Sequence, residues 1–153
     1  MSTLTSSLRE KDINLSLRAS GHRDAVEEIL APLRGDERVK DWEKLRTTLA
    51  SSIPDNSIGE TPSATFLHHC RSESVSDLVL AAGRSEPGIV IPGQETKVRL
   101  VFVAAIPEAF NNEYLRILGA ISRVCMESSA MSELIGAPDA PSFIAILEKG
   151  CRQ

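Results

Sequence analysis

Two adjacent histidines are the side chains whose types and spacing most suggest chemistry in this sequence. They lie in residues 65–71, together with a cysteine and an arginine. The apolar start and polar end of this segment are typical of a buried strand that reaches the surface at its carboxyl end. A neutral imidazole can act as a nucleophile, a general base or a metal ligand, or only pack in a core. Because successive strand residues point to opposite faces, we expect His68 and His69 to serve different environments.

The residues around these histidines favour phosphoryl transfer over metal binding. Transfer to histidine requires a neutral ring with one free nitrogen and donors for the phosphoryl oxygens. Arg71 follows the histidines, and hydroxyl side chains occur on both sides, including Ser63 in the preceding loop. A metal site would need ligands from distant segments, and His22 is the only other histidine, so we expect none. The alternative without chemistry is that both histidines are packing residues.

The composition indicates one globular domain over residues 1–153. Apolar residues make up 42% and charged residues 25%, which is ordinary for a folded domain. The net charge is −4 and no basic run occurs, which argues against nucleic acid as a ligand. Neither a signal peptide nor a membrane span is visible, and no phosphate-loop or dinucleotide motif indicates a cofactor. We therefore expect a cytoplasmic protein that is not membrane-inserted.

Cysteine usage supports the same compartment. Cys70, Cys125 and Cys151 are an odd number without metal-like spacing, so we expect reduced thiols. Cys70 could be a redox switch if Arg71 stabilised its thiolate. The alternative for Cys70 is a small buried residue.

Hydrophobic patterns predict an α/β protein with the element order β-α-α-β-β-β-α-α-α. We expect strands at residues 13–17, 65–71, 78–82 and 97–106, the last of them central because it is apolar throughout its second half. Residues 51–63 and 83–88 read as a loop and a turn, which would leave Arg84 in solvent. The expected helix signals are N-caps at Ser20, at Asn111 or Asn112 and at Asp139, and a stop at Gly150. Together these elements form one central sheet flanked by helices.

Several stretches of the chain resemble one known family. They are Phe66-Leu67-His68-His69, residues 75–84 with Gly88-Ile89, Val98-Arg99-Leu100-Val101-Phe102 with Pro107-Glu108, and the amphipathic residues 115–124. In this order they resemble the enzyme IIA proteins of the bacterial phosphoenolpyruvate-dependent phosphotransferase system, in the fructose, mannitol and nitrogen-regulatory (PtsN-like) class. The resemblance covers nearly the whole chain and implies a mixed sheet flanked by helices.

The resemblance also implies site residues and partners. By position His69 is the phosphorylated histidine, and His68 takes the place of a proline in the family motif. Arg71 and nearby hydroxyls such as Ser63 would hold the phosphoryl oxygens, and Tyr114 takes the place of a second family histidine. The implied donor is the small carrier HPr or its nitrogen-branch relative. The implied recipient is a membrane sugar permease component or a regulatory protein.

The approach to His69 departs from the family pattern. A glycine-rich stretch, Gly-x-Gly-Ile-Ala-Ile-Pro-His in the family, is replaced here by residues 60–69, which contain no glycine. Glycines let backbone come close to a phosphate, so this change alters the phosphate surroundings. The family's Glu-Arg pair is also absent near residues 51–52, and Arg46 lies earlier. Two hypotheses follow: a phosphohistidine carrier with phosphotransferase activity, or a regulatory binding module without efficient phosphotransfer.

Overall fold

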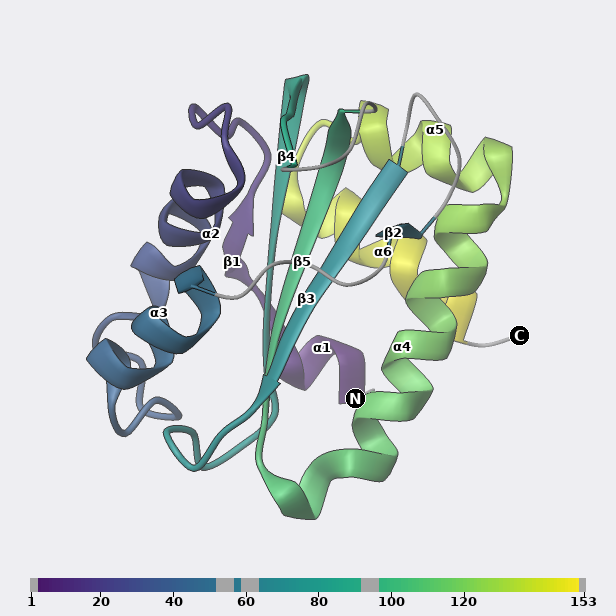
Figure 1. Ribbon diagram of the computed structural model, residues 1–153. Coiled ribbons are helices and arrows are strands. Elements are labelled where there is room, and N and C mark those ends of the chain that lie inside the picture. Colours follow the sequence, from purple (N-terminus) through teal and green to yellow (C-terminus); the bar gives the residue numbers. More distant parts are fainter. Residues whose placement is uncertain (1–2, 52–56, 59–63, 92–96, 152–153) are drawn as a thin grey trace.

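A five-stranded mixed sheet with helices on both faces forms the framework of the protein (Figure 1). The computed structural model describes residues 3–51, 57–58, 64–91 and 97–151. The strands are β1 (Leu8–Asn14), β2 (Ser57–Ile58), β3 (Ala64–Arg71), β4 (Val79–Ile89) and β5 (Val98–Ile106). The helices are α1 (Thr3–Ser7), α2 (His22–Leu30), α3 (Trp42–Ser51), α4 (Asn111–Met126), α5 (Ser128–Gly136) and α6 (Ala140–Cys151), with short 3-10 turns η1 (Ala31–Leu33) and η2 (Glu108–Phe110). The predicted class is confirmed, and α1 and β2 are additions to the predicted order.

The strand order β1-β4-β5-β3-β2 places β5 at the centre of the sheet. β5 is parallel to β3 and antiparallel to β4, and β1 is parallel to β4. Eight of the nine β5 residues are buried, all except Arg99, which explains why the rest of the strand is apolar. β3 and β5 therefore end at the same edge, where β1 and β4 begin. This is the lower edge of the sheet in Figure 1.

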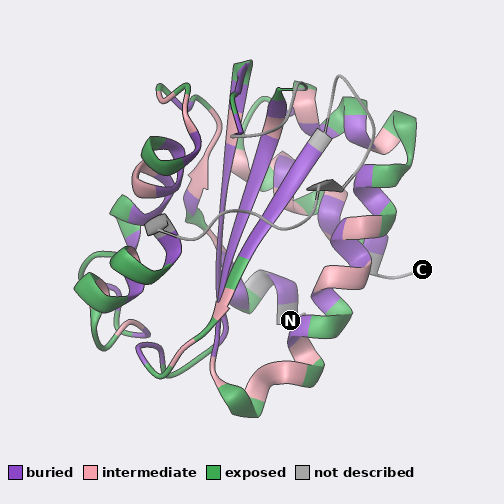
Figure 2. Ribbon diagram, in the orientation of Figure 1, coloured by how far each residue is buried: buried purple, intermediate pink, exposed green. Residues whose placement is uncertain are grey.

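The two faces of the sheet carry separate hydrophobic cores. On one face Leu67 and Phe102 pack beneath α1, α4, α5 and α6, with the Phe102 and Phe143 rings 6.1 Å apart. On the other face Phe66 and Val103 pack beneath α2 and α3. Burial of apolar surface on both faces stabilises the layered arrangement. Alternate residues of β3 consequently enter different cores, and β3 passes from buried to exposed at its lower end (Figure 2).

The predicted first strand was wrong in position. β1 spans Leu8–Asn14, where Leu8 pairs with Leu80 and is fully buried. Hydrophobic patterns do not detect this strand because its middle residues are charged. Asp12 is buried because it forms an ion pair with Arg38, not because it is apolar. Leu17 follows the strand and packs under α2, so the apparent alternation comes from a bend in the chain.

The predicted turn after residue 82 is instead the second half of β4. Gly83 pairs with Val101, and a Cβ atom there would lie 2.6 Å from Cδ1 of Leu17. The glycine thus provides space for packing and does not turn the chain. Arg84 is not solvated as expected, since its guanidinium donates to the carbonyl oxygens of Leu134 (3.0 Å) and Ala137 (2.8 Å).

The predicted Asn cap of α4 was also wrong. The turn η2 leads directly into α4, so that Phe110 precedes the first helical residue, and no side chain caps this end. The backbone N–H of Asn111 donates to Glu108 within η2. The first turn of α4 therefore begins immediately beyond β5, at the lower edge of the sheet.

Three other helix signals had mixed outcomes. Gly21, and not Ser20, precedes α2, without a side-chain cap. Asp139 does cap α6, accepting a hydrogen bond from a backbone amide of its first turn (2.9 Å). Gly150 does not end α6, which continues to residue 151; a Cβ there would lie 2.3 Å from Cγ2 of Val124. Within the predicted loop 51–63, β2 pairs with β3, and residues 52–56 and 59–63 lie outside the described residues.

Candidate active site

His69 lies at the lower end of β3, on the face that α4 covers. It pairs with Ala104 of β5, and its side chain is exposed. The imidazole lies beside Tyr114 in the first turn of α4, with 5.7 Å between the ring centroids. The exposure leaves the ring accessible to another protein, while the strand fixes its position.

His68 points to the opposite face, as the alternation of the strand predicts. Its side chain is 3% exposed, and its ring lies 5.3 Å from that of His22, the first residue of α2. Burial lowers the pKa of His22, and the neighbouring charge of Arg23 lowers it further. His68 therefore supports β3 from the α2 side of the sheet. It does not contact a group bound to the His69 ring, which lies on the other side.

Tyr114 brings an unsatisfied hydroxyl to the site. The residue is 4% exposed, and its hydroxyl has no hydrogen-bond partner among the described residues. Burial raises the pKa of this hydroxyl to about 12, although the charge of Arg71 acts in the opposite direction. The hydroxyl remains protonated at neutral pH and is available to donate one hydrogen bond. Buried polar atoms without partners are rare in folded proteins, so a missing acceptor is indicated.

Arg71 completes the group. It lies two residues after His69, hence on the same face of β3, and its side chain is exposed. Its charge reaches the Tyr114 hydroxyl. The structure thus brings three of the sequence-predicted site residues together: His69, Arg71 and Tyr114. Ser63 lies outside the described residues.

Arg46 is remote from this group. It belongs to α3, on the His68 face of the sheet, where it forms ion pairs with Glu27 and Glu43 (3.1 Å to Glu43). Its guanidinium also lies over the Trp42 ring, 5.7 Å from the centroid. These contacts hold Arg46 on the outer surface of α3, so Arg71 is the arginine nearest in sequence and on the same face as His69.

Cys70 does not have the properties of a redox switch. Its side chain is half-buried and packs with the core beneath α2 and α3, on the face away from His69. Burial raises the pKa of the Cys70 thiol to about 11, so the reactive thiolate is scarce at neutral pH. The small buried residue is the interpretation that the geometry supports.

Sequence reasoning missed two further residues of the first turn of α4. Asn111 Oδ1 and Glu113 Oε2 are buried and lack hydrogen-bond partners, like the Tyr114 hydroxyl in the same turn. The only available signal was their position in the first turn after a strand end, where loops and helix starts often carry functional side chains. Within the described part of the chain, no three His, Cys, Asp or Glu side chains are arranged to hold a metal ion.

The fold matches solved structures of enzyme IIA proteins. The nitrogen regulatory protein IIA-Ntr from Neisseria meningitidis superposes with a TM-score of 0.72 at 21% identity, covering 95% of this chain and 99% of that one. The putative IIA protein PtxA from Streptococcus mutans gives 0.72 at 15% identity, covering 100% and 97%. The mannitol IIA of Escherichia coli gives 0.66 at 17% identity, covering 92% and 99%. The predicted enzyme IIA fold is confirmed.

The sequence match identifies the family. Residues 6–150 match the family described as "Phosphoenolpyruvate-dependent sugar phosphotransferase system, EIIA 2", and the chain belongs to it. The fructose-specific EIIABC component of Bacillus subtilis is 23% identical over 149 residues, which are 95% of this chain and 23% of that protein. The chain thus spans less than a quarter of that relative. No helix in the described ranges has the length and apolar character needed to cross a bilayer.

Proposed function

We propose that this protein is a phosphocarrier that accepts a phosphoryl group on His69. The observation that supports this role is the exposed imidazole of His69 beside a cation and a buried donor without an acceptor, Arg71 and Tyr114. A phosphoryl group on the ring would supply the acceptor that the Tyr114 hydroxyl lacks. Membership of an enzyme IIA family supports the same chemistry.

The transfer step exchanges one nitrogen–phosphorus bond for another. A ring nitrogen of neutral His69 attacks the phosphorus of a phosphohistidine on the donor. The new bond forms as the donor's bond breaks, and each ring keeps its proton on the nitrogen that does not carry phosphorus. Arg71 neutralises charge on the phosphoryl oxygens, and the Tyr114 hydroxyl donates to one of them. His68 keeps β3 anchored in the opposite core.

The donor we propose is an HPr-type protein, or its nitrogen-branch relative. The recipient is a membrane sugar permease component or a regulatory protein. One fold relative, at 12% identity and a TM-score of 0.67, is the Escherichia coli mannitol IIA in complex with phosphorylated mannitol IIB, which supports a protein recipient. We place this exchange in the cytoplasm, a compartment consistent with the free thiols Cys70 and Cys125.

A second candidate function is a regulatory binding module that no longer transfers phosphate efficiently. Two features favour it. Arg46 is held in ion pairs on the far face, and Tyr114 stands where the family resemblance expects a second histidine. Tyrosine can donate a hydrogen bond but cannot carry a positive charge, so the phosphoryl site would be weaker.

Intact-mass spectrometry after incubation with phosphoenolpyruvate, enzyme I and HPr tests the proposal. We expect one added phosphoryl group on the native protein and on His68→Gln, and none on His69→Gln. The two variants are matched in chemistry and differ only in the face of β3. Circular dichroism checks that each is folded, because His68 is buried. No added mass from either HPr or its nitrogen-branch relative would refute phosphotransfer and favour the binding module.

A further inference from the structure

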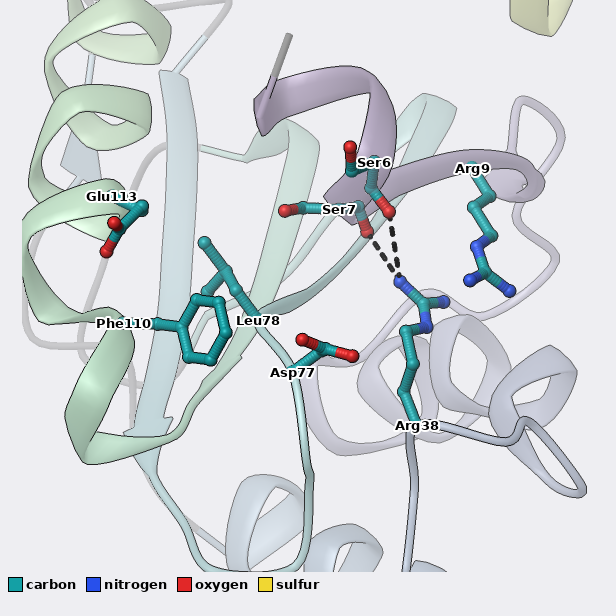
Figure 3. A pocket seen from close by; sticks show the side chains of 8 residues that line it. All are labelled: Ser6, Ser7, Arg9, Arg38, Asp77, Leu78, Phe110 and Glu113. Carbon is teal, nitrogen blue, oxygen red and sulfur yellow. Dashed lines mark hydrogen bonds between the residues drawn. The ribbon is translucent and has the colours of Figure 1, made fainter. Parts of the chain in front are cut away.

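A cavity of about 360 Å³ opens at the lower edge of the sheet, next to the first turn of α4 (Figure 3). Its walls come from the end of α1 and the start of β1, from the segment around Arg38, from residues 77–78 before β4, and from η2 and α4. The volume is within the range of small-molecule sites. No residue of the His69 group lines this cavity, so it is a separate site.

Two arginines line the cavity, and both pair with carboxylates of the protein. Arg9 forms ion pairs with Glu37 (3.1 Å) and Asp36 (3.9 Å). Arg38 donates through Nε and Nη2 to Asp36 (2.9 and 2.8 Å) and through Nη2 to Asp12 (3.1 Å). Its Nη1 donates to the carbonyl oxygens of Ser6 (3.5 Å) and Ser7 (3.1 Å) at the end of α1. These contacts use all five N–H groups of the guanidinium. Arg38 therefore has no donor left for an anion in the cavity.

The carboxylates in the wall are not engaged. Neither Asp77 nor Glu113 forms an ion pair with any residue that the structure describes. Glu113 Oε2 is buried and has no hydrogen-bond donor within reach. A buried carboxylate oxygen without a donor is costly, and such atoms in folded proteins nearly always have a partner. The missing partner is a hydrogen-bond donor, and positive charge would suit it best.

The remaining wall combines Ser6 and Ser7 of α1 with an apolar part. Figure 3 shows the Phe110 ring and Leu78 between Asp77 and Glu113. An aromatic ring stabilises a cation lying over its face, and Leu78 favours contact with methylene groups. Because the two arginines are already paired with carboxylates, a ligand that suits Asp77, Glu113 and the apolar part has a cationic donor at its end and a short aliphatic body.

We propose that this cavity binds a small organic cation that carries an ammonium or guanidinium group on a short aliphatic chain. Glu113 and Asp77 accept hydrogen bonds from the cationic group, and Phe110 and Leu78 pack against its carbon chain. Such a ligand gives the buried Glu113 oxygen the donor that the protein does not provide.

Binding there has a consequence for His69 that rests on the proposed function. Glu113 directly precedes Tyr114 in α4, so a ligand that fixes the Glu113 side chain also restrains the first turn of α4. The Tyr114 hydroxyl would be held in one position beside the His69 ring. We expect occupancy of the cavity to change the rate of phosphoryl transfer to His69.

Isothermal titration calorimetry with 1,4-diaminobutane and with butylguanidine tests binding directly. Inorganic phosphate and 1,4-butanediol serve as an anionic and an uncharged control. We expect saturable binding of at least one cation below about 10 mM at physiological salt, and none of either control. Saturable binding of phosphate in place of the cations, or no cation binding up to that concentration, would overturn the proposal.

Isosteric variants locate the site. Glu113→Gln and Asp77→Asn remove one charge each and should weaken cation binding about tenfold or more. Glu108→Gln removes an exposed carboxylate of η2 that does not line the cavity, and should change affinity by less than about twofold. If all three variants bound the cation with the affinity of the native protein, the cation would bind elsewhere. Phosphorylation of His69, followed separately by mass spectrometry, distinguishes failure of the cavity from failure of the carrier function.

Discussion

Replacing Tyr114 by phenylalanine should affect stability and phosphorylation in opposite directions. The substitution removes only the hydroxyl, which is buried and lacks a partner among the described residues, and keeps the ring that lies in the core beside His69. Burying an unpaired hydroxyl costs about 1–3 kcal/mol. We therefore expect the free energy of unfolding to stay the same or to rise by about 1 kcal/mol.

The phosphorylated state should respond in the other direction. A hydrogen bond to a charged acceptor contributes about 1.5–3 kcal/mol, which corresponds to roughly 10- to 100-fold in an equilibrium constant. Tyr114→Phe should lower the equilibrium constant for phosphoryl exchange with HPr by that factor. Intact-mass spectrometry of both proteins at equilibrium gives the ratio, and urea denaturation gives the stability.

A matched control is available in Ser85, whose buried hydroxyl does have a partner. Its Oγ accepts a hydrogen bond from the Gly88 amide (3.0 Å), so Ser85→Ala should destabilise the protein by about 1 kcal/mol without changing phosphoryl exchange. If Tyr114→Phe were as destabilising as Ser85→Ala, the Tyr114 hydroxyl would have a partner in the unphosphorylated protein. If the exchange constant were unchanged, Tyr114 would not contact the phosphoryl group. Either result would refute the reasoning.

Three further predictions concern the framework. Arg38→Met should lower the free energy of unfolding by about 3–5 kcal/mol in urea denaturation, because two fully buried aspartates lose their main partner; a loss below about 1 kcal/mol would contradict this. The Arg38 guanidinium holds the pKa of Asp36 well below its usual range. Asp36 therefore binds a proton more readily in the unfolded chain than in the folded protein. The stabilisation by its charged form is complete above about pH 5 and is lost progressively as the pH falls below about 4. A free energy of unfolding that did not change with pH in this range would argue against it. Gly83→Ala should lower the free energy of unfolding by about 1–3 kcal/mol, because the added Cβ clashes with Leu17 and Ile29. Gly136→Ala, with open space around the added Cβ, should not lower it measurably. Equal thermal unfolding midpoints of the two variants would show that the core adjusts to the added methyl group.

Local patterns in the sequence were sufficient for the class and for most of the element order, without α1 and β2, and the family followed from the resemblance. The run at residues 97–106 predicts a central strand because its second half is continuously apolar, as in a strand covered on both faces. The alternation of side chains along a strand is enough to place His68 and His69 on opposite faces. Helix α3 follows from the helical spacing of Trp42, Leu45 and Leu49. Each of these inferences depends on neighbours in the chain.

Other features depend on contacts between distant segments, and the sequence does not reveal them. β1 is a strand despite its charged middle because Arg38 neutralises Asp12 in the interior. Gly83 lies within β4 because Leu17 and Ile29 need the space that a side chain would fill. In both cases the local signal argues against a strand: a charged run suggests an exposed segment, and a glycine suggests a turn. Tertiary packing nevertheless makes both segments strands.

The candidate site divides in the same way. The residue types around His69 indicate phosphoryl chemistry, and the family resemblance assigns its position in the chain. Only the tertiary structure shows that Tyr114 is buried against His69 with an unsatisfied hydroxyl, and that Glu113 faces a cavity without a partner. The physical reason is that hydrogen bonding and burial at this site depend on contacts between separate elements at the lower edge of the sheet. Hydrophobic periodicity along the chain carries no information about those contacts.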